Sequence, residues 1–294
     1  MSFIIVGDNG SNLPVEVIDH FDLKILPMAF SCEGKEYHSY LKGQEIDLAS
    51  FYRMMREGKE FITSLISYGD CKNLLDPVIE ASDDDLLYIG MSSGISGSFN
   101  VVSNYLAEQQ EQHPGRRFVA IDTFAASLGE GLLVRRAARL REEGKSLDEV
   151  CAWLQETIPH MGNWFTVDDL MFLFRGGRLS RTSALAGTLL DIKPTIHMDD
   201  EGKLIPVGKV RNRRKSLAAL VDRAETLALR PLDKGMLAVS HADCLQDAEY
   251  VADLVCERFE GVTRDDILIN VIDPVIGSHS GPGTVALFFL ARER

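Results

Sequence analysis

Residues 90–94 of the chain, Gly-Met-Ser-Ser-Gly, match the G-x-S-x-G pattern, in which a nucleophilic serine lies on a turn between a strand and a helix. Ser92 would be the nucleophile and His279 its base. Asp122 or Asp243 could supply the acid between them, in the chain order of α/β-hydrolases. Because few positions of the pattern are fixed, it also arises by chance in loops rich in glycine and serine. A serine esterase that uses Ser92 with His279 is therefore kept as an alternative.

The loop at residues 92–98 could instead bind an anion. Its serine hydroxyls and flexible backbone amides precede a predicted helix. The free N–H groups and the dipole of a helix N-terminus favour a negative charge there. Ser92 and Ser93 could thus serve a carboxylate or a phosphate, whereas a plain turn with Ser98 as the helix cap is the structural alternative.

Thr63 and Ser64 end the third predicted strand. In a parallel sheet their side chains would project toward the same edge as the loop at 92–98. Hydroxyls that converge from two strand ends can satisfy a buried carboxyl group, although isolated residues of this kind also cap helices. His279 lies in a glycine- and serine-rich segment at 276–283, where an imidazole could hydrogen-bond or neutralise an acid.

Two basic segments stand out in a chain rich in acid. Residues 175–181 (RGGRLSR) place arginines around a glycine pair, which implies backbone that turns tightly or is closely approached. Residues 209–215 (KVRNRRK) follow a predicted hairpin strand. Together they could bind a phosphate or an acidic partner, unless they are ordinary charges on solvated helix faces.

The first half of the chain alternates short apolar runs with amphipathic stretches, which is typical of βα units on a mostly parallel sheet. We expect strands at residues 3–7, 23–30, 61–64, 86–90 and 118–122. We expect helices at residues 48–57, 72–81, 98–112, 127–143 and 146–157. Asp47 and Ser98 are predicted helix caps. Small polar groups should therefore meet at the carboxyl edge of the sheet, where open α/β folds bind ligands.

The second half has a different pattern, and we place the boundary between an α/β domain (1–160) and an α+β domain (161–294) near Pro159 and Gly162. Residues 195–210 predict a β-hairpin with a turn that contains Asp and Gly. The later elements expected are a helix to about residue 229, strands at 236–240 and 267–272, a helix at 245–258 and a glycine-rich end.

Composition narrows the class of protein. A chain of 294 residues with 45% hydrophobic residues can bury a sizeable core, and its net charge of −13 repels nucleic acid and anionic membranes. The five cysteines are scattered and include no CxxC pair, which favours thiols in a reducing compartment. With no leader and no apolar run of about 18 residues, we expect a cytoplasmic protein that is not integral to a membrane. No motif for a nucleotide, a metal or another cofactor is present.

The ordered motifs resemble those of the DegV family, whose members include the fatty-acid-binding subunits of bacterial fatty acid kinase. The similar segments are VGDNGSNLP (6–14), TSLIS (63–67), MSSGISGSFN (91–100), IDTFAASLGEGLLV (121–134), LFRGGRLSRTSALAGTLLDIKP (173–194), VGKVRNRRKSL (207–217) and IGSHSGPG (276–283). Each motif alone is weak, but their joint order and spacing are specific. Two departures bear on the loops: Ile66 replaces the usual proline, and Asn9 with Gly10 replaces Ser-Thr in the first motif.

The resemblance implies a non-catalytic carrier that buries a long-chain fatty acid of roughly 14 to 20 carbons, with a parallel-sheet α/β domain and an α+β domain. The positions that would hold the carboxylate are Thr63, Ser64, Ser92 or Ser93, and His279. Arg178 and Arg211 would help to dock the kinase subunit that phosphorylates the bound acid. From the missing motifs and the net charge we expect no cofactor, no metal and no nucleic acid partner, with at most transient membrane contact for ligand exchange.

Simple energetics agree with such a carrier. Burying a methylene is worth about 0.8 kcal/mol, so roughly fifteen of them contribute about 12 kcal/mol before entropic costs. An unpaired buried carboxylate would cancel much of that gain, so several donors are needed at one end of an apolar tunnel.

Overall fold

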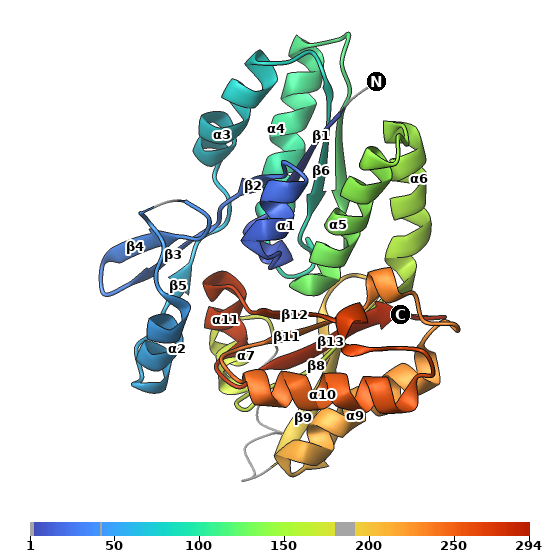
Figure 1. Cartoon of the computed structure of the whole chain (residues 1–294). Coiled ribbons are helices and arrows are strands. Elements are labelled where there is room, and N and C mark those ends of the chain that lie inside the picture. The colour runs from blue at the N-terminus through green and yellow to red at the C-terminus, as the bar shows by residue number, and fades with distance from the viewer. Residues whose placement is uncertain (1–2, 42, 180–191) are drawn as a thin grey trace.

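The computed structural model describes residues 3–41, 43–179 and 192–294, and the strands within them form three sheets (Figure 1). The first, here the parallel sheet, has the strand order β2-β1-β6-β7. Its strands are β1 (Phe3–Asp8), β2 (Lys24–Leu26), β6 (Asp85–Gly90) and β7 (Phe118–Asp122). The connecting helices are α1 (Val15–His20), α3 (Tyr68–Glu80), α4 (Ser98–Gln112), α5 (Leu128–Glu142) and α6 (Leu147–Thr157). The predicted α/β class with a parallel sheet is confirmed.

The second sheet has six strands in the order β10-β9-β8-β13-β11-β12 and is antiparallel except for the β11–β12 pair. Its strands are β8 (Met161–Thr166), β9 (Ile192–Met198), β10 (Leu204–Arg211), β11 (Ala238–His241), β12 (Leu268–Val271) and β13 (Val285–Leu290). Helices α9 (Arg213–Leu227) and α10 (Leu245–Arg258) accompany it. The predicted hairpin is confirmed as β9–β10. Strands β8 and β13, which pair at the centre of the sheet, were not predicted.

A third, smaller antiparallel sheet corrects two expectations. It contains β3 (Ala29–Cys32), β4 (Lys35–His38) and β5 (Ile62–Thr63), next to helix α2 (Leu48–Arg56). The single strand expected at 23–30 is in fact β2 and β3, which belong to different sheets, because Pro27 lacks an N–H and cannot continue a ladder. The prediction that Thr63 ends a strand of the parallel sheet is also wrong, since β5 pairs antiparallel with β3.

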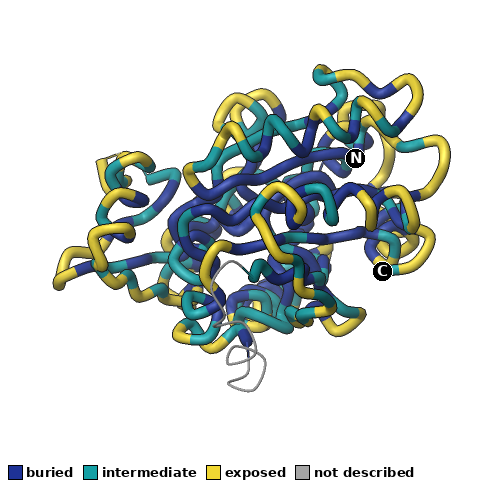
Figure 2. Tube along the Cα trace, turned by 90° about the horizontal axis from the view of Figure 1, so that it is seen from below, coloured by how far each residue is buried: buried dark blue, intermediate teal, exposed yellow. Residues whose placement is uncertain are grey.

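Helix α5 lies between the parallel sheet and the six-stranded sheet (Figure 1). Its buried side chains, such as Leu132 and Leu133, share one apolar core with Ile5 of β1 and Phe288 of β13. In Figure 2 the strands run through the interior as buried segments, while loops and helix ends are exposed. The parallel sheet uses residues before 123 and the six-stranded sheet uses residues from 161 on, and the division into domains 1–160 and 161–294 stays a prediction.

Helix ends decide how the loops are held. Asp47 caps α2 as predicted, its carboxylate accepting the Ser50 N–H at 2.9 Å. Ser98 is not the cap of α4, because Gly97 occupies that position. The Ser98 hydroxyl instead accepts the backbone N–H of Ile66 at 3.0 Å, a bond that the usual proline could not make.

Helix α11 (Pro274–Ser280) lies where a glycine-rich loop was expected, so His279 is helical. Asp273 caps its start by accepting the Val275 N–H at 2.8 Å, and Pro274 suits the first helical turn. Gly281, at φ 81°, ends the helix in a conformation that favours glycine. Within the described ranges, no helix combines the length and apolar character needed to span a bilayer.

Candidate functional site

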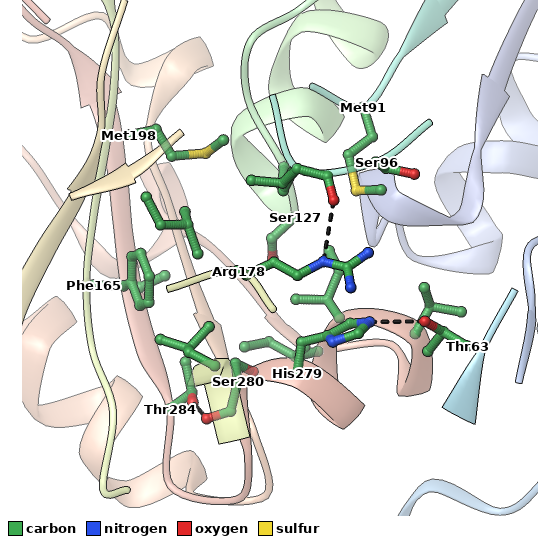
Figure 3. A pocket seen from close by; sticks show the side chains of 18 of the residues that line it. Thr63, Met91, Ser96, Ser127, Phe165, Arg178, Met198, His279, Ser280 and Thr284 are labelled. Carbon is green, nitrogen blue, oxygen red and sulfur yellow. Dashed lines mark hydrogen bonds between the residues drawn. The ribbon is translucent and has the colours of Figure 1, made fainter. Parts of the chain in front are cut away.

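A cavity of about 240 Å³ lies between loops at the carboxyl end of the parallel sheet, the six-stranded sheet and α11 (Figure 3). A dry cavity of about 150 Å³ is enough to admit a benzene-sized molecule, so this one can take a larger apolar group. Most of its lining is apolar and includes Met28, Met91, Ile95, Phe165, Leu173, Met198, Leu204, Val275, Ala286 and Phe288. An elongated apolar ligand with few polar groups suits such a lining.

Polar groups form one wall of the cavity. His279 of α11 and Thr63 of β5 meet there, with 2.7 Å between the imidazole Nε2 and the hydroxyl Oγ1. Ser64 also lines the cavity and is exposed, so this wall lies near the surface. In Figure 3 Thr63 and His279 lie on the opposite side from Phe165 and Met198. The cavity thus has one polar wall, and most of the rest of its lining is apolar.

Arg178 belongs to the same wall. It follows helix α7 (Met171–Arg175), donates through Nε to the Ile95 carbonyl at 3.1 Å, and also donates to the carbonyl of Gly176. Burial lowers the pKa of Arg178, and no carboxylate of the described residues pairs with its guanidinium. We expected Arg178 to dock a partner. The structure places it where it can also attract an anion in the cavity.

His279 is poised as a neutral group. Burial, and then the charge of Arg178, lowers the pKa of His279 to about 4. A neutral imidazole offers a hydrogen bond without a permanent charge. It therefore avoids the cost of keeping an unpaired cation in the empty cavity.

Gly176 explains why the glycine pair after α7 is needed. A Cβ atom at this position would lie 2.2 Å from Nδ1 of His279, so only glycine lets the imidazole lie flush against the α7 turn. The glycine pair at 176–177 indicated that another group approaches the backbone closely, and at Gly176 that group is the His279 imidazole. The last two residues of the basic segment, 180 and 181, lie outside the described residues.

Ser92 and Ser93 do not line the cavity. Ser92 is fully buried, and its hydroxyl donates to the Gly202 carbonyl at 2.8 Å. Ser93 uses its backbone N–H to bind the Asp122 carboxylate at 3.1 Å. Of the five predicted carboxylate ligands, the structure brings together Thr63, Ser64 and His279. The roles of Ser92 and Ser93 stay predictions.

The esterase arrangement is not assembled. Ser92 bonds to Gly202, whereas His279 bonds to Thr63. Of the two candidate acids, Asp122 accepts backbone N–H groups, and Asp243 pairs with Arg56. The G-x-S-x-G pattern therefore has a structural use in this chain, described below.

Sequence reasoning missed several polar residues of the lining. Ser96 lies two residues before the start of α4, and Ser127 lies at the start of α5 with φ 56° and its hydroxyl 2.8 Å from that of Ser240. Asn163 and Ser280 are buried in the lining as well. Ser96 and Ser127 belong to the quoted motifs, but a motif cannot tell which of its serines faces inward.

Asn9 connects the first motif to this site. Its side chain accepts the Met28 N–H at 2.9 Å and donates to the Asp273 carboxylate at 3.2 Å, so it joins the end of β1 to the cap of α11. A Cβ atom on Gly10 would lie 2.7 Å from Asp8 Oδ1 and 2.8 Å from the Met91 sulfur. The departure from Ser-Thr thus keeps a compact turn that supports α11.

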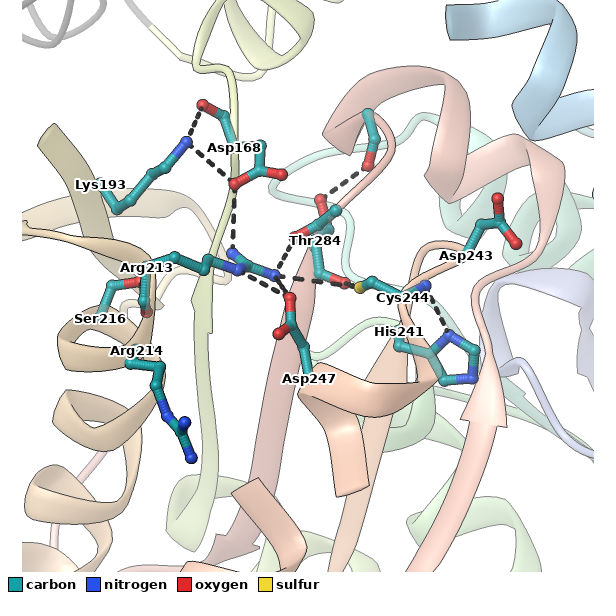
Figure 4. A network of polar contacts seen from close by, with 12 residues as sticks. Asp168, Lys193, Arg213, Arg214, Ser216, His241, Asp243, Cys244, Asp247 and Thr284 are labelled. Atoms are coloured by element: carbon teal, nitrogen blue, oxygen red, sulfur yellow. Dashed lines mark hydrogen bonds and ion pairs between the residues drawn. The ribbon is translucent and has the colours of Figure 1, made fainter. Parts of the chain in front are cut away.

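The second basic segment divides in two. Arg211 is exposed at the end of β10. Arg213 instead forms a network in which it contacts Asp247 at 2.8 Å, Asp168 at 3.5 Å and the Gly283 carbonyl at 2.5 Å (Figure 4). Lys193 joins Asp168 at 2.9 Å. This network ties α9 and α10 to the turn after α11, so Arg213 is structural, and Arg211 remains available at the surface.

Comparison with known proteins now identifies the family. The model of DegV, described as an uncharacterised protein family, matches residues 2–292. The chain belongs to the DegV family. A DegV domain-containing protein of Clostridium perfringens is 35% identical over 290 residues, covering 98% of this chain and 97% of that protein.

Solved DegV structures share the whole fold. A fatty acid binding DegV family protein from Streptococcus agalactiae is 29% identical with a TM-score of 0.84, and each chain is covered completely. A DegV lipid binding protein from Thermotoga maritima is 26% identical with the same TM-score and complete coverage of both chains. A fatty-acid-binding DegV protein from Thermus thermophilus is 27% identical with a TM-score of 0.82, covering 99% of this chain and 100% of that one.

The first test concerns Gly176. The change Gly176→Ala should push the His279 ring away from Thr63 and lower the free energy of unfolding by about 1–3 kcal/mol, because a buried hydrogen bond is broken and the turn is overpacked. Chemical denaturation measures this. Gly115→Ala is the control, since a Cβ atom there meets nothing within 4 Å. Equal stability of the two variants would contradict the packing argument.

The second test concerns pH. The pKa of His279 is about 4 in the folded protein, below its ordinary value of 6.5, so the unfolded chain binds more protons between these values. Stability should therefore fall as pH falls through that window, and wild type should lose about 2 kcal/mol more than His279→Gln between about pH 7 and pH 5. Denaturation at both pH values measures the difference. His20→Gln, at an exposed imidazole, is the control, and parallel curves for wild type and His279→Gln would refute the assignment.

Proposed function

We propose that this DegV protein binds a long-chain fatty acid and presents its carboxylate to a separate kinase. The observation that carries the proposal is an apolar cavity with a wall formed by Thr63, His279 and Arg178. The related proteins from Streptococcus agalactiae and Thermus thermophilus are fatty acid binding proteins, which supports the same ligand class here.

The head group would lie against the polar wall. The Thr63 hydroxyl can donate to a carboxylate oxygen, and the Arg178 guanidinium supplies a positive charge nearby. His279 can donate from its neutral ring or take up a proton once the anion is bound, because a nearby negative charge raises the pKa of an imidazole. Ser64 and Ser96 add hydroxyls at the same cavity.

The alkyl tail would lie among the apolar side chains of the two sheets and α11. At about 0.8 kcal/mol for each buried methylene, the tail dominates affinity while the wall sets its direction. The sequence carries no nucleotide-binding motif, so phosphorylation of the carboxylate requires a partner that binds the nucleotide. Exposed Arg211 would contribute to docking that partner, and the carrier itself would do no chemistry.

Ligand binding is tested with purified protein. Mass spectrometry of an organic extract should find a long-chain fatty acid, and delipidated protein should rebind hexadecanoic acid. Thr63→Val removes the hydroxyl and keeps the shape, so it should weaken binding by about 1–3 kcal/mol. Thr226→Val is the control, because that hydroxyl bonds within α9. If no acid is found and none can be loaded, the proposal is wrong.

Presentation is tested with a fatty acid kinase and loaded carrier. Arg211→Ala should leave fatty acid loading unchanged and raise the carrier concentration needed for half-maximal acyl phosphate formation by about tenfold, as expected for loss of one charged contact at an interface. Arg136→Ala, on α5, is the control. An unchanged dependence on carrier concentration would remove Arg211 from the interface.

A further inference from the structure

A second cavity adjoins the polar wall. It has a volume of about 440 Å³ and shares Thr63, Arg178 and His279 with the first cavity. Its other side is formed by the segment that leads from α2 into β5, by α7 and by α11, including Lys59, Glu60, Phe61, Phe172, Arg175 and Ser278. The same three side chains therefore face two spaces, one mostly apolar and one more polar.

The second cavity is positively charged. Its lining has three cations, Lys59, Arg175 and Arg178, against one carboxylate, Glu60, although the chain as a whole carries −13. A local excess of cations in an acidic protein is a feature that the overall composition does not explain. It favours an anionic ligand at this place.

Two of these cations are held in exchangeable contacts. Lys59 pairs with Glu33, and Arg175 pairs with Glu60 at 3.4 Å, and both glutamates are well exposed, at 64% and 76% of their side chains. Exposed ion pairs of this kind contribute little to stability. The Arg175 guanidinium also stacks on the Phe172 ring at 4.8 Å, which fixes its position beside the wall. An incoming dianion could therefore replace the glutamates without disturbing the fold.

We propose that the second cavity is a phosphoryl subsite, in which Lys59 and Arg175 hold the phosphoryl group of an acyl phosphate whose tail stays in the first cavity. This deepens the proposed function and rests on it. In the transfer, a carboxylate oxygen bonds to the terminal phosphorus of a nucleoside triphosphate held by the partner. The bond to the nucleoside diphosphate breaks, and that diphosphate leaves with the electron pair.

Charge balance explains why a separate subsite is required. The carboxylate carries one negative charge, whereas the acyl phosphate head is larger and carries about two. Thr63 and neutral His279 suit the smaller anion but cannot compensate the added charge. Lysine and arginine can, because charge-assisted hydrogen bonds to phosphoryl oxygens are the strong ones, and Arg175 is already oriented by Phe172.

The test compares hexadecanoic acid with hexadecyl phosphate, a stable probe with a similar tail and a phosphoryl head. In the double variant Lys59→Met/Arg175→Gln, hexadecyl phosphate should bind about tenfold or more weakly, and hexadecanoic acid should change less than about twofold. The matched control is Lys72→Met/Arg136→Gln, which removes two cations from surface ion pairs elsewhere. Isothermal titration at two salt concentrations gives the affinities of wild type and both double variants for each probe, together with their ionic-strength dependence.

The outcomes separate the two proposals. Selective loss of the phosphate probe in the cavity variant supports the subsite. If both probes lose affinity equally, or the phosphate probe loses none, the subsite is wrong even though the carrier function stands. If wild type binds the phosphate probe but not hexadecanoic acid, the carrier function fails, and the acyl phosphate subsite that rests on it fails with it. If wild type binds neither, both proposals fail.

Discussion

The hydrogen bond between Thr63 and His279 is the contact on which the site depends, because it joins the small sheet to α11 at the wall between the two cavities. Neither residue is held by its own element alone. Helix α11 is placed by the Asp273 cap, which Asn9 fixes from the end of β1. The His279 ring also needs the bare backbone of Gly176 beside it. A short polar contact thus integrates three distant parts of the chain.

The wall satisfies two opposing requirements. An apolar cavity lowers the free energy of an alkyl tail but raises that of any charged group that lacks a partner. Hydroxyls and a neutral imidazole can face an empty cavity at small cost, and they still donate to a carboxylate when one arrives. Arg178 is the only cation among the first cavity's described lining residues, and its bonds to the Ile95 and Gly176 carbonyls reduce its desolvation cost.

The sequence predicts most of the helices and part of the site, and each wrong or missed prediction has a physical cause. The periodicity of hydrophobic residues and the capping residues predict most helices and the β9–β10 hairpin, because these elements depend on the local spacing of residue types. Thr63 does face the site, but through an antiparallel strand, since a propensity pattern cannot say which sheet a short strand joins. Arg178 reaches the wall because of the turn that follows α7. Ser127 lines the cavity in a backbone conformation with positive φ. Neither is encoded in the spacing of residue types.

The G-x-S-x-G pattern shows how one motif can serve structure in place of catalysis. Gly202 lies in the β9–β10 turn at φ 68°, and its carbonyl accepts a hydrogen bond from the Ser92 hydroxyl. A Cβ atom on Gly202 would lie 2.0 Å from the hydroxyl oxygen of Ser92. A Cβ atom on Gly94 would in turn lie 2.4 Å from the Glu201 carbonyl oxygen. The hairpin turn can dock on the loop at 92–98 only because both glycines lack side chains, and Ser92 fills the gap between them. The Ser92 hydroxyl therefore ties the hairpin turn to the loop, and it has no imidazole beside it, because His279 bonds to Thr63.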